Sequence, residues 1–163
     1  MDEVYIVSFE LEDREVFCLW YSDEKGKDSL LKDNNRILTF NSVEHINAYC
    51  IKNALPLSKN PTHKYNLNYI ILEIENPVFS ADKILDFWNI VEDISRTAGI
   101  EFCGNFLTDE VNNLYDKLFF ASNIPAIRGN DPEYIPTWDA TERELLMNIV
   151  HKGVLMTKEF VFY

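Results

Sequence analysis

The chain begins with two runs of apolar and polar positions that suit paired β-strands. Residues 4–11 alternate between two sets of side chains and are rich in β-branched and aromatic residues, which predicts a strand with one well-buried face. The polar residues 12–14 form a turn, and residues 16–21 repeat the strand pattern. Residues 3–22 are therefore predicted to form an antiparallel hairpin.

The pattern then changes from strands to helical spacing. Residues 22–35 are polar and predict a loop, and residues 36–40 predict a third short strand. A pair resembling a capping box starts a helix over residues 41–53. Residues 57–66 are polar and predict another loop. Two alternatives stay open for residues 67–75, because their composition favours a strand and their position between helices allows a helix.

Helical spacing is clearest in the second half of the chain. Apolar positions recur every three or four residues from Ile84 to Ala98, and Gly99 supplies a C-terminal stop. A further helix is predicted to start near Thr108. Residues 123–136 contain prolines and a glycine and are predicted to be irregular.

The last part of the chain is predicted to contain a helix followed by a strand. Asp139 and Glu142 form a capping pair that begins a helix running toward Gly153. Residues 154–163 are then expected to return as a terminal strand. The order of elements predicts a single α+β domain over residues 1–163, with an antiparallel sheet of about four to five strands packed with about four helices.

The charge of the chain narrows the classes of partner. Its 27 acidic and 15 basic side chains give a net charge of −12 over 163 residues. This charge repels phosphate backbones and anionic membranes and favours basic partners, so we expect no direct binding to nucleic acid or membrane. The sequence has neither a basic signal-peptide region at its start nor an apolar run approaching the ~20 residues of a membrane helix. We therefore expect a cytoplasmic protein.

The residue types that carry most chemistry do not form a recognised motif. None of the three histidines lies within three or four residues of a cysteine or of another histidine, and the five glycines are not grouped as in a phosphate-binding loop. Acidic pairs such as Glu92 and Asp93 are expected by chance among so many acids. We therefore predict no catalytic residue, no cofactor and no metal. An enzyme whose site joins Cys103 or a histidine to several carboxylates from distant segments remains an alternative.

Four short motifs within residues 82–152 carry a family resemblance. They are ILDFWN at 84–89, YDKLFF at 115–120, NIPAI at 123–127, and YIPTW at 134–138 with the helix after it. In these segments the sequence resembles the immunity proteins of contact-dependent growth inhibition systems, which belong to bacterial polymorphic-toxin loci. The resemblance implies a protein that binds the toxic C-terminal domain of a cognate effector and blocks its active site or substrate surface.

The resemblance also implies a reason for the acidity. Many such toxins are nucleases with basic substrate surfaces, and an acidic inhibitor can mimic the charge pattern of phosphates and accelerate association. The alternative is an acidic adaptor or nucleic-acid mimic that acts on another basic partner.

The candidate partner-binding residues were chosen for their charge and expected exposure. Most lie in the acidic N-terminal region, where residues 1–35 contain ten acids and four bases. Aromatic residues beside acidic sequence, such as Trp20 and Trp138, also suit a protein interface, where they anchor while charges steer encounter. The candidates are Glu12, Asp13, Asp23, Glu24, Asp28, Asp131, Glu133 and Tyr134.

Overall fold

The N-terminal hairpin forms the centre of the sheet. The computed structural model describes residues 3–123 and 134–163. Strands β1 (Tyr5–Leu11) and β2 (Arg14–Ser22) pair antiparallel, with Tyr5 opposite Trp20 and Phe9 opposite Val16. The predicted hairpin is confirmed.

Three further strands complete a mixed sheet around this hairpin. Strands β3 (Asp28–Leu30) and β6 (Thr39–Phe40) pair antiparallel with different parts of β2. Strand β7 (His63–Asn66) pairs parallel with β1 on the other side. The expectation of a purely antiparallel sheet, and of a loop throughout residues 57–66, was therefore wrong. In β7 only Tyr65 is buried, so the strand has almost no apolar pattern by which to recognise it.

A small second hairpin occupies part of the predicted loop at residues 22–35. Strands β4 (Lys32–Asp33) and β5 (Arg36–Ile37) pair antiparallel, and Asn34 and Asn35 turn between them with φ of 47° and 67°. Two successive positive φ angles are typical of the tight turns that favour asparagine. The third strand predicted over residues 36–40 is divided between β5 and β6.

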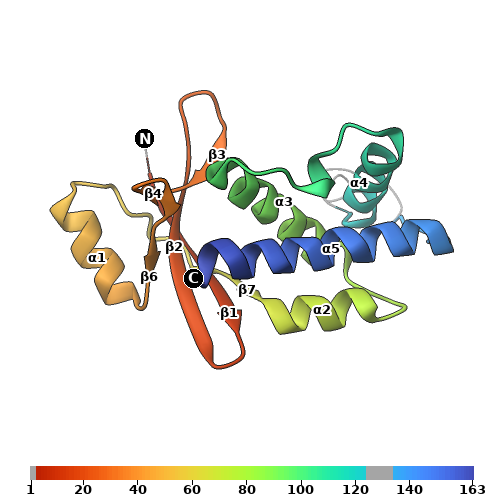
Figure 1. Ribbon diagram of the computed structural model, residues 1–163, viewed down its shortest axis with the longest axis horizontal. Coiled ribbons are helices and arrows are strands. Elements are labelled where there is room, and N and C mark those ends of the chain that lie inside the picture. Colours follow the sequence, from red (N-terminus) through yellow and green to blue (C-terminus); the bar gives the residue numbers. More distant parts are fainter. Residues whose placement is uncertain (1–2, 124–133) are drawn as a thin grey trace.

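Helices cover both faces of the sheet (Figure 1). Helix α1 (Val43–Lys52) lies on one face, where it packs with alternate strand residues such as Phe17 and Leu19. Helices α2 (Leu67–Glu75), α3 (Ala81–Ala98) and α5 (Ala140–Val161) lie on the other face, and α4 (Asp109–Ala121) packs on α3. The fold is α+β, as the element order predicted.

The helix boundaries settle the open alternatives. Residues 67–75 are helical, because Leu67, Ile70 and Ile74 are buried at helical spacing and the Asn66 side chain accepts a hydrogen bond from the backbone N–H of Tyr69. Helix α3 ends at Gly99, whose φ of 71° is the left-handed conformation expected of a C-terminal glycine stop.

The predicted terminal strand at residues 154–163 was wrong. Helix α5 continues through Gly153 to Val161, and Val154, Thr157 and Val161 are buried at helical spacing. A Cβ atom added at Gly153 would lie 3.0 Å from a methyl carbon of Val91 and 3.2 Å from the Phe87 ring on α3. The glycine therefore allows two helices to approach closely and does not end α5.

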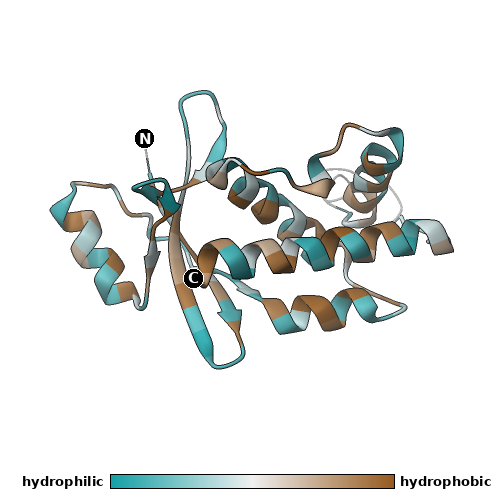
Figure 2. Ribbon diagram, viewed as in Figure 1, coloured by the Kyte–Doolittle hydropathy of each residue, from teal (hydrophilic) through white to brown (hydrophobic). Residues whose placement is uncertain are grey.

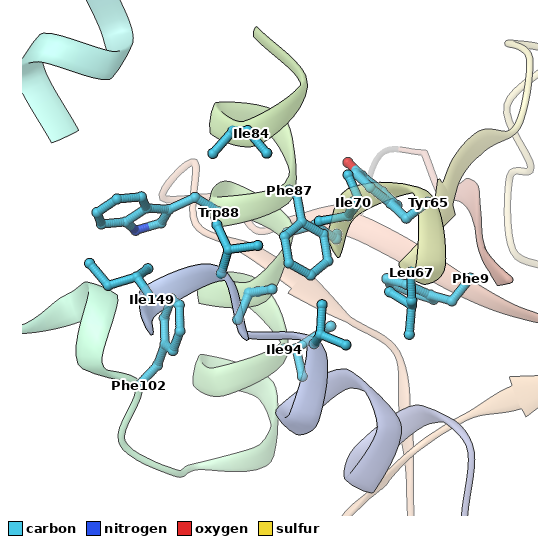
Figure 3. Packing of buried hydrophobic residues seen from close by; sticks show 14 of the residues in the cluster. Phe9, Tyr65, Leu67, Ile70, Ile84, Phe87, Trp88, Ile94, Phe102 and Ile149 are labelled. Carbon is cyan, nitrogen blue, oxygen red and sulfur yellow. The ribbon is translucent and has the colours of Figure 1, made fainter. Parts of the chain in front are cut away.

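The main core lies between the sheet and the helices on that face. The helices bear alternating hydrophobic and hydrophilic stripes (Figure 2). Phe87 and Trp88 of α3 are both 1% exposed, and Phe87, Ile94 and Leu67 gather in the same packed region (Figure 3). Within the described residues, each helix is too short or too polar to cross a membrane.

Candidate functional site: an acidic groove

A cavity of about 700 Å³ opens between β1, the segment leading into β7, and one face of α3. Val4 bridges Leu57 and Val7 pairs with His63, so three more residues separate the two contacts on the incoming segment than on β1. The incoming segment therefore bends away from β1 and leaves the space open. We call this cavity the acidic groove and define it by three carboxylates and three aromatic side chains of its lining: Asp28, Asp86, Asp93, Tyr5, Trp20 and Tyr65.

Helix α3 supplies the polar wall of the acidic groove. Asp86, Asn89 and Asp93 are spaced by three and four residues, which places them on one face of the helix. The opposite face carries core residues such as Phe87 and Val91. The same helix thus fixes the core and aligns two carboxylates along the groove.

Asp93 holds the Trp20 side chain in place. One carboxylate oxygen of Asp93 accepts a hydrogen bond of 2.8 Å from Trp20 Nε1, and the other accepts one of 2.6 Å from Arg96 Nη1. The Asp93 side chain is only 11% exposed. Burial raises the pKa of Asp93, although both hydrogen bonds and the Arg96 charge act in the opposite direction. Tyr5 packs against Trp20 in an edge-on geometry, with ring centroids 5.5 Å apart.

Asp86 presents a more accessible carboxylate farther along α3. Its side chain is 51% exposed, and Oδ2 lies 3.8 Å from Nδ1 of His63. That distance is too long for a hydrogen bond. Burial within the concave surface raises the pKa of Asp86, and His63 partly offsets the rise. Burial also raises the pKa of Tyr65, with the negative charge of Asp86 contributing.

Asp28 is both a partner-binding candidate chosen from the sequence and a residue that lines the acidic groove. Its carboxylate accepts a hydrogen bond from the Ser22 hydroxyl, and its backbone carbonyl accepts one of 2.6 Å from Arg96 Nη1. Arg96 therefore joins the start of β3 to Asp93 on α3. Of the candidates chosen from the sequence, Asp28 lines the groove together with Asp86 and Asp93.

The other acidic candidates divide between the two ends of β2. Glu12 and Asp13 lie in the turn between β1 and β2, whereas Asp23 and Glu24 lie in the turn between β2 and β3. Nine residues of β2 separate these turns, which corresponds to about 30 Å in an extended strand. The structure therefore does not gather these acids on one surface.

Asp23 also has a local structural role. Its Oδ1 accepts hydrogen bonds of 2.8 Å from the backbone N–H groups of both Lys25 and Lys27, and these bonds lower its pKa. This geometry stabilises the turn that leads to Asp28. The Asp23 carboxylate is therefore partly committed to its own loop.

Of the candidates at residues 131–134, the structure describes only Tyr134. Tyr134 is 45% exposed, and its backbone N–H donates a 2.8 Å hydrogen bond to Oδ1 of Asn123 at the end of α4. Asp131 and Glu133 lie outside the described residues. Tyr134 is not among the residues that line the acidic groove.

Sequence reasoning missed most of the groove. The spacing of Asp86, Asn89 and Asp93 is a usable signal, since it marks one polar face on a helix whose other face is apolar. The pairing of Asp93 with its sequence neighbour Glu92 hides this face, because adjacent residues on a helix point about 100° apart. Tyr65 had no comparable signal, because β7 was not predicted.

The groove lining also contains His63 and Lys64, but Lys64 Nζ pairs with Oε1 of Glu15 at 3.0 Å and the three carboxylates outnumber these basic groups, so the groove suits a bound cation. Carboxylates attract positive charge, and aromatic faces bind ammonium or guanidinium groups through the ring quadrupole. Within the described residues, no three His, Cys, Asp or Glu side chains are grouped as a metal site would require. Cys103, the thiol considered from the sequence, lies in the short 3-10 helix η1 (Cys103–Asn105), and burial raises its pKa.

Comparisons with known proteins show a similar fold and do not identify a family. The sequence matches no protein-family model, and a search of curated proteins finds no match. The crystal structure of the SatS C-terminal domain in complex with bromine is similar to this chain with a TM-score of 0.54. The likeness covers 96% of this chain and 91% of that chain at 10% sequence identity. At this identity the similarity shows a shared fold alone.

Proposed function

We propose that this protein is an inhibitor that binds and neutralises a basic protein partner, namely the toxin domain of a contact-dependent growth inhibition effector. The observation that carries the proposal is the acidic groove, in which Asp28, Asp86 and the aromatic side chain of Trp20 line one cavity. The net charge of −12 and the resemblance in residues 82–152 support the same function.

The chemistry of inhibition follows from charge and shape. The overall negative charge attracts a basic domain from a distance and raises its association rate. Aromatic side chains in a concave surface then supply contact area close to the carboxylates. A nuclease toxin held in this way loses access to its substrate, because its basic surface is covered.

The test uses the protein encoded beside this one. Expressing that neighbour alone should arrest growth, and co-expressing the present chain should restore it. The purified proteins should form a complex whose affinity falls as salt rises from 50 to 500 mM, because exposed charges are screened. A toxin preparation that has been heat-denatured provides the control for non-specific adsorption.

Two outcomes would contradict the proposal. If the neighbouring protein is harmless in cells that lack this chain, it is not a toxin and the proposed partner does not exist. Recovery of a housekeeping protein in place of the neighbour would favour the acidic adaptor or nucleic-acid mimic.

A further inference from the structure

We propose that the acidic groove binds one arginine side chain of the partner, with the guanidinium group stacked on the Trp20 indole and paired with the Asp86 carboxylate. This inference rests on the proposed function and deepens it, because it names the chemical group that the groove takes. Three features of the groove support it: an aromatic surface, an available carboxylate and the shape of the cavity.

The aromatic surface is fixed before any partner arrives. The hydrogen bond from Trp20 Nε1 to Asp93 sets the orientation of the indole, and Arg96 holds the same carboxylate from the other side. When an indole N–H donates to a carboxylate, the electron density of the indole ring rises, and the ring attracts a cation more strongly. Trp20 lines the cavity and is only partly buried. The groove therefore offers an oriented cation-binding surface.

Asp86 is the carboxylate suited to pair with the incoming charge. Asp93 already accepts hydrogen bonds at both oxygens, whereas the Asp86 carboxylate is approached by the Tyr65 hydroxyl and by His63, whose Nδ1 lies 3.8 Å away. The oxygens of Asp86 can therefore accept the parallel N–H groups of a guanidinium. The carboxylate is also half exposed, so a side chain from solvent can reach it.

The shape of the cavity favours arginine on a peptide over lysine or a small free cation. Ile90 and Pro61 supply apolar wall along which an aliphatic stem can pack. Only the planar guanidinium both stacks on an aromatic ring and pairs with a carboxylate through two N–H groups. A cavity of about 700 Å³ also has room for the residues flanking the arginine.

The experiment uses the full chain labelled with 5-fluorotryptophan, which places a fluorine probe on Trp20, Trp88 and Trp138. The ligand is an acetylated, amidated peptide Gly-Gly-Arg-Gly-Gly, with lysine and citrulline versions as matched probes. Citrulline keeps the shape of arginine and removes its charge. The arginine peptide should shift the Trp20 resonance saturably, the lysine peptide should bind several-fold more weakly, and the citrulline peptide should have no effect.

Matched variants then test the role assigned to Asp86. Asp86→Asn should weaken the arginine peptide about tenfold, because a charge-assisted pair is lost while the side-chain volume is kept. Asp116→Asn on α4 is the control, since that exposed residue lies outside the groove, and it should leave binding unchanged. An unshifted resonance of the buried Trp88 verifies that each variant is folded.

Three results would overturn the inference: equal binding of the citrulline peptide, a shift at Trp138 with Trp20 unaffected, or unchanged binding by Asp86→Asn. The outcome can be separated from that of the proposed function. If Asp86→Asn neutralises the toxin as well as the parent protein does, the inhibitor function stands and the arginine site fails. If the peptide binds but no toxin is neutralised, the arginine site stands and the toxin assignment fails.

Discussion

The two ends of strand β2 both carry acidic residues, but their surroundings differ. At one end, Glu12 and Asp13 are exposed in the turn of a hairpin. Toward the other end, Asp28 shares a cavity with Asp86 and with the aromatic ring of Trp20. The first region offers charge on a convex tip, and the second offers charge within a concave, partly apolar surface.

This difference shows that acidic residues alone do not locate a binding surface. Exposed carboxylates on a tip are well solvated, so their interactions are weak and strongly screened by salt. Carboxylates in a concave site lie in a lower effective dielectric and can meet a partner at fixed geometry. Both regions contribute to long-range attraction, and we expect only the groove to contribute strongly to the bound complex.

The largest expected effect is on partner affinity. Asp28→Lys with Asp86→Lys should weaken binding of the toxin about 100-fold, because two attractive contacts become repulsive. Glu12→Lys with Asp13→Lys changes the net charge by the same amount and should weaken it about threefold through slower association. Biolayer interferometry measures both. Equal losses would show that total charge, and not the groove, determines affinity.

The second effect is on folding stability. Asp93→Ala should lower the free energy of unfolding by about 2 to 3 kcal/mol, because Trp20 Nε1 and Arg96 lose a buried, charged acceptor. Asp13→Ala, at the exposed tip, should change it by less than about 0.5 kcal/mol. Urea denaturation followed by circular dichroism distinguishes them. A change at Asp93 as small as that at Asp13 would mean that the hydrogen-bonded pair does not stabilise the groove.

The third effect is a pH dependence of binding. Burial raises the pKa of Asp86 in the free protein above the ordinary aspartate value of 3.8, and a bound cation lowers it. Binding therefore favours the ionised form, and affinity should fall about tenfold as the pH drops through the raised pKa. Calorimetry on Asp86→Asn should show this pH dependence removed, whereas Glu12→Gln should retain it. A pH profile shared by the parent and Asp86→Asn would assign the titration to another group.

The smallest effect is the change in stability on neutralising Asp86. A carboxyl whose pKa is raised in the folded state stabilises the protein at low pH, and that contribution is lost as pH rises through the folded-state pKa. Asp86→Asn should therefore raise stability slightly at pH 7, by about 0.5 kcal/mol or less because the side chain is half exposed, and the gain should shrink in acid. Asp13→Asn should show no such gain. A lower free energy of unfolding for Asp86→Asn at pH 7 would contradict the predicted direction of this change.

Local patterns predicted the parts of the fold that local physics controls. The hairpin follows from alternating side chains over residues 4–21, and helix α3 follows from its apolar spacing and the stop at Gly99. The prediction at Gly153 was wrong because a glycine after a helical pattern resembles a C-terminal stop, whereas α5 continues to Val161. Its actual role depends on Val91 and Phe87 of another helix, which no local pattern reveals.

The groove could be predicted only in part. Asp28 was chosen for its charge, and its neighbours Asp86 and Asp93 lie more than fifty residues away in sequence. Their meeting depends on the parallel pairing of β7 with β1 and on the packing of α3 against β3. These are long-range contacts. Local sequence patterns can assign each acid to a helix, strand or loop, but they do not predict that the three acids line one cavity.

The most direct measurement is a backbone amide NMR titration of the isotope-labelled protein with its toxin partner. We expect the largest shifts at residues 86–93 of α3 and at the Trp20 indole N–H, with little change at Glu12 and Asp13. Shifts confined to that turn, with α3 unaffected, would contradict the assignment of the acidic groove as the binding face.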